Sequence, residues 1–139
     1  MAKIAVEADY AASAAKVWEK LADFGGIGSW MPGVAKCELA GSGIGATRTI
    51  SMGPMKVVER LEAFDPAARL LSYSIVEGPM PTRDYLATIH VQETGPGRCH
   101  VDWTARFELP PGLGEEQVRP ALEGAYGGAL KALRPLVES

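Results

Sequence analysis

Residues 114–139, at the C-terminal end, have the spacing of one long amphipathic helix, and they follow an almost unbroken run of strand-like segments. A long terminal helix and a curved antiparallel sheet can enclose a cavity between them, which favours a small-molecule ligand. The apolar residues of the predicted helix recur at steps of three and four and so share one face. They are Val118, Leu122, Ala125, Tyr126, Ala129, Leu133, Leu136 and Val137.

Proline and glycine disturb this helical pattern. Pro120 is too far inside for a first-turn proline, which predicts a kink or a true start near Arg119. Gly124, Gly127 and Gly128 each cost about 1 kcal/mol of helix stability relative to alanine. They indicate either close packing of the helix on the sheet or space left for a ligand beneath it.

The preceding residues predict seven strands and two short helices. A first strand covers residues 3–10, a helix over 14–23 is capped by Ser13, and a short helical turn covers 27–31. Short Gly/Pro turns separate the later segments, which is typical of an antiparallel meander. We therefore predict an α+β helix-grip fold in which the curved sheet wraps around the C-terminal helix, with residues 1–139 as one domain. The later strands are expected at 34–40, 46–52, 55–64, 69–77, 82–93 and 98–108.

Composition excludes several classes of function. A net charge of −3 offers no basic surface for nucleic acid. No apolar run approaches the roughly 18 residues of a membrane span, and the N-terminus lacks the apolar core of a secretory signal. Cys37 and Cys99 are isolated, which favours reduced thiols. We expect a cytoplasmic protein without a cofactor or metal, as a monomer or weak homodimer.

The order of elements and four short motifs resemble a known superfamily. The motifs are Ala-Ser-Ala-Ala-Lys-Val-Trp over residues 12–18, Gly-Ala-Thr-Arg over 45–48, Glu-Arg-Leu over 59–61, and Asp84-Tyr85. Over nearly the whole chain, they resemble the START-like helix-grip (SRPBCC) superfamily. The nearest similarity is to small bacterial polyketide cyclase/dehydrase-like proteins, with a more distant one to plant abscisic-acid receptors. The resemblance implies a START-like domain that binds a small, mainly hydrophobic ligand.

Strand alternation predicts which side chains face the cavity, because successive residues point to opposite faces. In the fourth strand, Glu59 shares a side with Val57, Leu61 and Ala63, so an inward face would place a carboxylate in an apolar cavity. The inward residues of the last three strands are Leu71, Tyr73 and Ile75; Tyr85, Ala87, Ile89 and Val91; and Val101, Trp103, Ala105 and Phe107.

Two lines of reasoning predict opposite orientations for the Lys36 side chain. Periodicity places Cys37 and Leu39 inside and Lys36 outside. The resemblance instead implies that Lys36 reaches into the pocket to a ligand carboxylate, with further polar contacts from Glu59 and Tyr85. An inward Lys36 and Glu59 could compensate each other's buried charge. The alternative is that both lie on the surface.

Two loops fall where the receptor family has its gate and latch. Residues 51–54 occupy the gate position and residues 78–83 the latch position. Neither has the receptor motif, which argues against hormone-dependent phosphatase binding. The loops are either adaptable lids or ordinary hairpin turns. The residues expected to form the gate-like loops are Met52, Gly53, Pro54, Gly78, Pro79 and Met80.

No catalytic signature is present, and His90 and His100 are both expected on the surface. The leading hypothesis is a binding protein for a small apolar ligand that can carry a carboxylate or carbonyl group. One alternative is a cyclase, dehydratase or isomerase of a polyketide-like or other carbonyl substrate that uses Glu59, Lys36 and Tyr85. Another is a ligand-dependent protein-interaction module. The expected ligand-binding residues are Lys36, Glu59, Tyr73, Ile75, Tyr85, Ala87, Trp103 and Tyr126.

Overall fold

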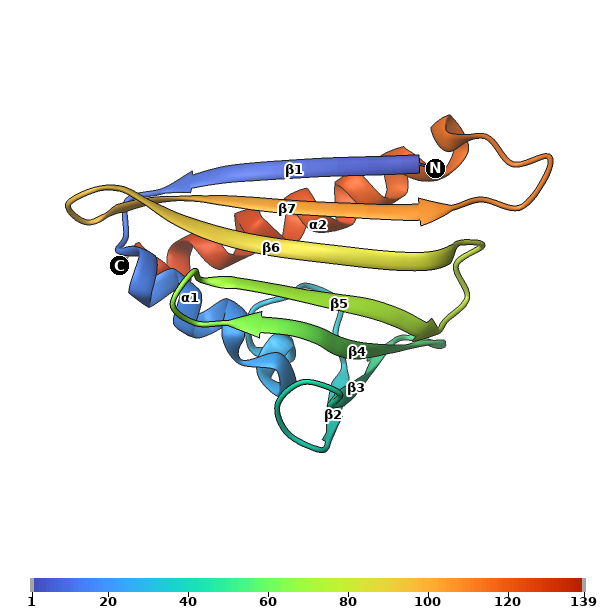
Figure 1. The fold of residues 1–139 in the computed structure, drawn as a ribbon, viewed down its shortest axis with the longest axis horizontal. Helices are drawn as coiled ribbons and strands as arrows, with labels where there is room; N and C mark the ends of the chain where they lie inside the picture. Colours follow the sequence, from blue (N-terminus) through green and yellow to red (C-terminus); the bar gives the residue numbers. More distant parts are fainter. Residues whose placement is uncertain (1, 139) are drawn as a thin grey trace.

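The computed structural model describes residues 2–138 and confirms the predicted order of elements (Figure 1). A first strand leads into two short helices, six strands follow, and a long helix closes the chain. Ser139, at the end of the predicted terminal helix, lies outside the described residues. The elements are β1 (Ala2–Tyr10), α1 (Ala14–Ala22), the 3-10 helix η1 (Phe24–Ser29), β2 (Lys36–Ala40), β3 (Thr47–Met52), β4 (Met55–Asp65), β5 (Leu70–Glu77), β6 (Arg83–Gly95), β7 (Arg98–Glu108) and α2 (Glu115–Val137).

All seven strands form one antiparallel sheet in the order β1-β7-β6-β5-β4-β3-β2. Strands β2 to β7 are a meander, and β1 pairs with β7. In a meander, alternate turns lie at the same end of the sheet. The β3–β4 turn, the β5–β6 loop and the segment from β7 to α2 therefore share one end, on the right in Figure 1.

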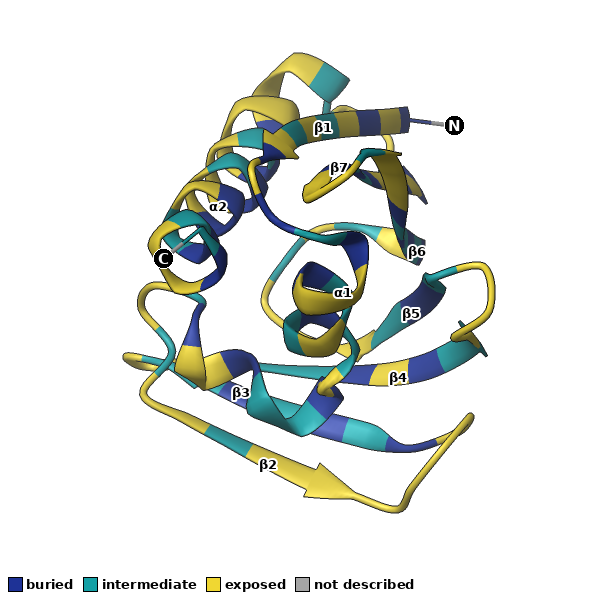
Figure 2. Cartoon of the chain, turned by 90° about the vertical axis from the view of Figure 1, so that its left-hand side faces the viewer, coloured by how far each residue is buried: buried dark blue, intermediate teal, exposed yellow. Residues whose placement is uncertain are grey.

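Viewed from the end, the sheet curves round with α1 and α2 on its inner side (Figure 2). Ser13 caps α1 as predicted, because its hydroxyl accepts a hydrogen bond from Lys16 N at 3.2 Å. Helix α2 runs beside β1. The Tyr10 hydroxyl donates to Leu130 O at 2.6 Å, and Lys3 N donates to Glu115 Oε1 at 2.9 Å. These two bonds fix the first turn and the second half of α2 against β1.

Helix α2 differs from the predicted helix at its start and along its buried face. It begins at Glu115 and continues through Pro120 and Pro135, so the late start near Arg119 is wrong. Ala125 and Leu136 are exposed, whereas Leu130, which the spacing left out, is buried. The buried face is turned slightly toward Leu130, on the side that meets Tyr10 of β1.

The glycines of α2 do not leave space for a ligand. Gly124 and Gly128 are exposed, and a Cβ atom added at either would meet nothing within 4 Å. Gly127 faces β1, where an added Cβ would lie 3.8 Å from Val6 Cγ1, an ordinary contact. The interpretation that these glycines make room beneath the helix is therefore wrong for Gly124 and Gly128.

Replacing Gly124 or Gly128 by alanine should stabilise the protein by about 0.5–1 kcal/mol each, because alanine restricts the unfolded chain and favours the helix. Urea unfolding of the two variants measures this gain. Gly112→Ala is the matched control. Its residue is exposed too but has φ +89°, so the same substitution should destabilise. A loss of stability in Gly124→Ala would contradict the assignment of an open, solvent-facing position.

Candidate ligand-binding site

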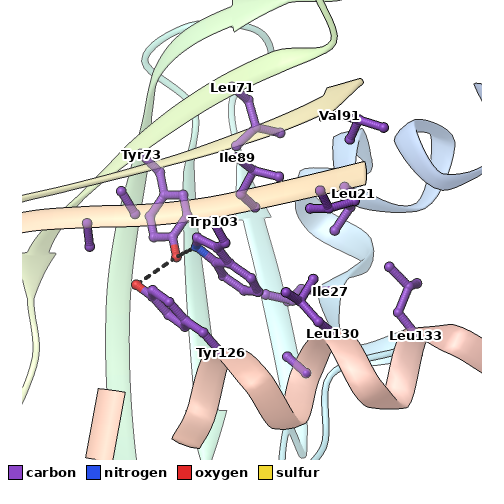
Figure 3. Packing of buried hydrophobic residues seen from close by; sticks show 14 of the residues in the cluster. Leu21, Ile27, Leu71, Tyr73, Ile89, Val91, Trp103, Tyr126, Leu130 and Leu133 are labelled. Atoms are coloured by element: carbon purple, nitrogen blue, oxygen red, sulfur yellow. Dashed lines mark hydrogen bonds between the residues drawn. The ribbon is translucent and has the colours of Figure 1, made fainter. Parts of the chain in front are cut away.

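Four aromatic side chains converge between the sheet and α2. Tyr73 comes from β5, Tyr85 from β6, Trp103 from β7 and Tyr126 from α2, and all four are buried. Trp103 stacks on Tyr126 with ring centroids 4.1 Å apart, and its Nε1–H donates to the Tyr73 hydroxyl at 3.2 Å. The Tyr73 hydroxyl donates to that of Tyr126 at 3.2 Å (Figure 3). The Tyr126 hydroxyl is in turn bonded to the Tyr85 hydroxyl. We call these four residues the hydroxyl cluster.

A β-bulge at the start of β6 aims Tyr85 into this cluster. Arg83 pairs with Glu108 and Leu86 with Arg106, so Asp84 and Tyr85 together face the single residue between them on β7. Asp84 adopts a positive φ of 50°, a conformation that aspartate tolerates better than most residues. The Tyr85 ring consequently stacks on Phe107, with centroids 5.5 Å apart.

The hydroxyl cluster has one more hydrogen-bond donor than it uses. The indole of Trp103 and the hydroxyls of Tyr73, Tyr85 and Tyr126 supply four protons, but only three hydrogen bonds join them. Among residues 2–138, one hydroxyl proton of the Tyr85–Tyr126 pair therefore has no acceptor. An unused buried donor typically costs about 1–3 kcal/mol, so the cluster favours an added acceptor.

Burial keeps the hydroxyl protons in place. Desolvation raises the pKa of Tyr85, and it raises those of Tyr73 and Tyr126 well above the usual value of a tyrosine. All three groups are therefore neutral donors near pH 7. They are suited to hold an acceptor oxygen and poorly suited to act as bases.

Trp30 provides a second unused donor beside the cluster. Its side chain is buried at the end of η1, its ring centroid lies 6.2 Å from that of Trp103, and its Nε1–H has no acceptor among the described residues. No periodic pattern marks this position in the sequence, because η1 is a short irregular turn among glycines. Trp30 and the hydroxyl cluster thus present two free donors, and both lie beside the Trp103 ring.

A buried ion pair lies next to the cluster. Glu59 faces inward as predicted, but its partner is Arg48, which is directly opposite on β3. Arg48 Nη2 lies 2.7 Å from Glu59 Oε1, and Arg48 Nη1 donates to Phe24 O at 3.0 Å. The Arg48 guanidinium also covers the rings of Phe24 and Tyr73, at 3.9 and 5.1 Å from their centroids. Burial raises the pKa of Glu59, and the charge of Arg48 limits that rise.

The predicted pairing of Lys36 with Glu59 is wrong. Lys36 is exposed on β2, and its ammonium lies 3.2 Å from Glu38 on the surface. Cys37 is half-buried against the core, as periodicity indicated, but Leu39, which periodicity also placed inside, is 51% exposed. Alternation could also have found Arg48, because it lies two residues before the buried Ile50 on the same face.

Arg48→Met should destabilise the protein by about 3–5 kcal/mol, because it leaves the Glu59 carboxylate buried without a partner. The double variant Arg48→Met/Glu59→Leu should recover most of that loss, since it removes both charges. Urea unfolding measures each change. Lys36→Met is the matched control and should stay within about 0.5 kcal/mol of the wild type. An Arg48→Met variant as stable as this control would contradict the buried pairing.

The other predicted site residues are split between the interior and the loops. Ala87 is fully buried beside Tyr73 on the neighbouring strand, whereas Ile75 is only half-buried. Met52 and Met80 pack on the edge of the core. The remaining loop residues, Gly53, Pro54, Gly78 and Pro79, are exposed. Both loops lie at the same end of the sheet as Tyr85. That they act as lids stays a prediction.

His100 lies on the outer face, where carboxylates surround it. Its Nδ1 is 2.8 Å from Asp9 Oδ1, and its Nε2 is 3.2 Å from Asp102 Oδ1. Glu7, His100 and Asp102 have ligand atoms within 4.8 Å of one another, a spacing that a metal ion could use. The hydrogen bonds to Asp9 and Asp102 raise the pKa of His100. They account for the grouping of these side chains without a metal ion.

The raised pKa of His100 predicts a pH-dependent contribution to stability. Protonated His100 is favoured in the folded state, so its contribution is full below the unfolded pKa of about 6.5. It is lost as the pH rises through the higher folded pKa. Unfolding free energies of the wild type and His100→Gln should therefore differ more at pH 5.5 than at pH 9. Asp9→Asn should shrink that difference, and a difference independent of pH would rule out this account.

Comparison with known proteins agrees with this architecture. The model of the polyketide cyclase / dehydrase and lipid transport family matches residues 1–138. The chain belongs to this family. Membership implies a cavity for a hydrophobic ligand in this helix-grip fold. A comparison with curated protein sequences finds no match, and no helix within residues 2–138 is long and apolar enough to cross a membrane.

Solved structures resemble this family member closely. XoxI from Bacillus cereus superposes with a TM-score of 0.89 at 28% identity, over 99% of this chain and 96% of that one. A solution structure from Thermobifida fusca gives a TM-score of 0.86 at 33% identity, over 96% and 91%. Norcoclaurine synthase from Thalictrum flavum, solved with dopamine and hydroxybenzaldehyde, gives 0.79 at 24% identity, over 96% and 84%. The last similarity concerns the fold alone.

Proposed function

We propose that this chain is a single-domain binding protein for a small, mainly hydrophobic ligand that carries a carbonyl or carboxylate oxygen. The ligand lies between the sheet and α2, against the hydroxyl cluster. Family membership supports the hydrophobic cavity, and the surplus of buried donors supports the oxygen. That surplus is the observation on which the proposal rests.

The two free donors define what the ligand must offer. One hydroxyl proton of the Tyr85–Tyr126 pair and the Trp30 indole proton lack acceptors among residues 2–138. A ligand oxygen accepts such protons, whereas a hydrocarbon would leave both donors unused. Neutral tyrosine and tryptophan donors suit a carbonyl oxygen. The Arg48 guanidinium beside Tyr73 is already paired with Glu59, so it adds no net charge, and a carboxylate would be held by the same neutral donors.

Binding requires side chains to move, because Trp103 stacks directly on Tyr126. The ligand would separate the Tyr126 ring from its partners on the sheet and replace the stacking contact with its own apolar surface. The turns at Met52–Met55 and Gly78–Met80 lie at the end of the sheet nearest Tyr85, so we propose that the ligand enters there.

A matched pair of probes tests the donor surplus. 2-Acetylnaphthalene carries an acceptor oxygen, and 2-ethylnaphthalene has nearly the same shape without one. The ketone should bind about two- to tenfold more tightly, since one hydrogen bond contributes about 0.5–1.5 kcal/mol. In ¹H–¹⁵N spectra it should shift the indole N–H signals of Trp30 and Trp103. Trp18, which lies against Phe64, serves as the internal control and should not move.

Equal affinity for the two probes, or saturable shifts that spare Trp30 and Trp103, would contradict the proposal. Trp30→Phe provides a second check, because it removes one free donor without removing any acceptor. This variant should lose part of the preference for the ketone and keep its affinity for the hydrocarbon.

A second candidate function is a cyclase, dehydratase or isomerase. It is favoured by Glu59, a buried carboxylate whose raised pKa suits acid–base work. The ion pair with Arg48 weighs against it, because the carboxylate is already engaged. Liquid chromatography with mass spectrometry of carbonyl probes after incubation with the protein separates the two functions. Isomers and dehydrated products elute apart from the probe, whereas a binding protein returns each probe unchanged.

A further inference from the structure

The outer face of β1, β7 and β6 has an ordered pattern of side chains at one end. Lys3, Arg106 and Leu86 are in register across the three strands and form a first row. The next row on the same face contains Ala5, Thr104 and Thr88. Neighbouring rows are about 7 Å apart, because residues two positions along a strand share a face.

The first row places two like charges directly opposite each other, an arrangement that destabilises a sheet. Among residues 2–138, neither the Lys3 ammonium nor the Arg106 guanidinium makes an ion pair. The chain as a whole has a net charge of −3, so two adjacent cations without a partner are not explained by its average composition. An anion from outside the chain would relieve their repulsion.

A pocket of about 730 Å³ covers these two rows. Beyond them, Arg119 and Glu123, one turn apart on α2, complete its wall. Three cations and one anion line the pocket, so its lining carries a net charge of +2. Arg119 is held by Glu115 at 2.6 Å, which leaves Lys3 and Arg106 as the uncompensated pair.

The lining of the pocket and the row of residues beyond it restrict the polarity of the ligand and the position of its charge. Leu86, Ala5 and the backbone around Ile4 provide apolar surface, and Thr88 and Thr104 provide hydroxyls. The third row along the face, Glu7 opposite Asp102, is acidic and would repel a ligand that extended negative charge that far. The charge of the ligand must therefore lie at one end, within the first two rows.

We propose that this outer pocket binds a small organic anion, a carboxylate or phosphate monoester with a short apolar body. The anion lies between Lys3 and Arg106, and the apolar body covers Leu86 and Ala5. The side chains of the two rows lie on the outer face of the sheet, opposite the core, so this site is separate from the interior one. The two could be occupied together.

NMR titration with 4-phenylbutyrate, phenyl phosphate and the neutral 4-phenylbutanamide tests the proposal. At least one of the two anions should give saturable amide shifts at Ala5, Leu86 and Thr104, and the stronger of them identifies the headgroup. The amide should bind at least tenfold more weakly. Lys3→Gln/Arg106→Gln should weaken anion binding at least tenfold, and raising the salt from about 20 to 300 mM should weaken it in the wild type.

The matched control is Arg98→Gln/Lys131→Gln, which removes the same charge from two exposed residues outside the pocket lining. It should bind the anions as the wild type does. The Lys3→Gln/Arg106→Gln variant should melt no lower than the wild type, because it removes two opposed like charges, so lost binding cannot be attributed to unfolding.

Four results would overturn the proposal. Shifts that do not saturate, or are equal in the two double variants, would indicate an adventitious ion only. Binding of the neutral amide as tightly as the anions would show that charge does not drive binding. Saturable shifts confined to Trp30 and Trp103 would place the probes in the interior. Outer-face shifts that depend on protein concentration without any probe would assign the face to a second copy of the chain.

Discussion

The contact between α2 and the inner face of the sheet determines most of this structure. A helix of this length is stable in water mainly when its apolar face is buried, and here that face can only meet side chains that alternate inward along the curved strands. Bonds from Tyr10 and Lys3 fix α2 beside β1. This placement brings Tyr126 over Trp103, where the stacked rings join the helix to the middle of the sheet.

Polar groups in the interior are the second constraint. Apolar side chains of similar volume often replace a buried ion pair without loss of stability, so Arg48 and Glu59 are not needed merely to hold a core together. The same holds for three tyrosine hydroxyls that do not satisfy one another completely. The Arg48 guanidinium lies over Tyr73, so the ion pair and the hydroxyl cluster form one polar region inside an apolar shell. Such a region fits the recognition of a ligand better than it fits packing.

Strand alternation predicted most of the interior because it follows from backbone geometry. Tyr85, Ala87 and Trp103 were placed correctly on this basis. Alternation fails where the pairing shifts. The register change between Leu61 and Ala63 turns Phe64 inward to meet Trp18, which a strict period of two does not allow.

Other parts of the site depend on tertiary contacts that no local pattern encodes. Trp30 follows an irregular turn, so its burial depends on where η1 lies against Trp103. For Lys36, family resemblance and periodicity disagreed, and periodicity was right. A family resemblance matches positions in two sequences. It does not determine which face of a strand a side chain occupies, because that depends on how the strand is paired in this protein.

Strand β2 is the last strand of the sheet, and its pairing with β3 leaves the backbone groups of its other edge available. An open edge of this kind is a template on which another chain can add a strand, which is a common route to aggregation. The exposed Lys36 and Glu38 on this strand would have to give up water if a neighbouring chain docked there. The lysine that resemblance assigned to a ligand thus helps to keep the protein from polymerising through its own sheet.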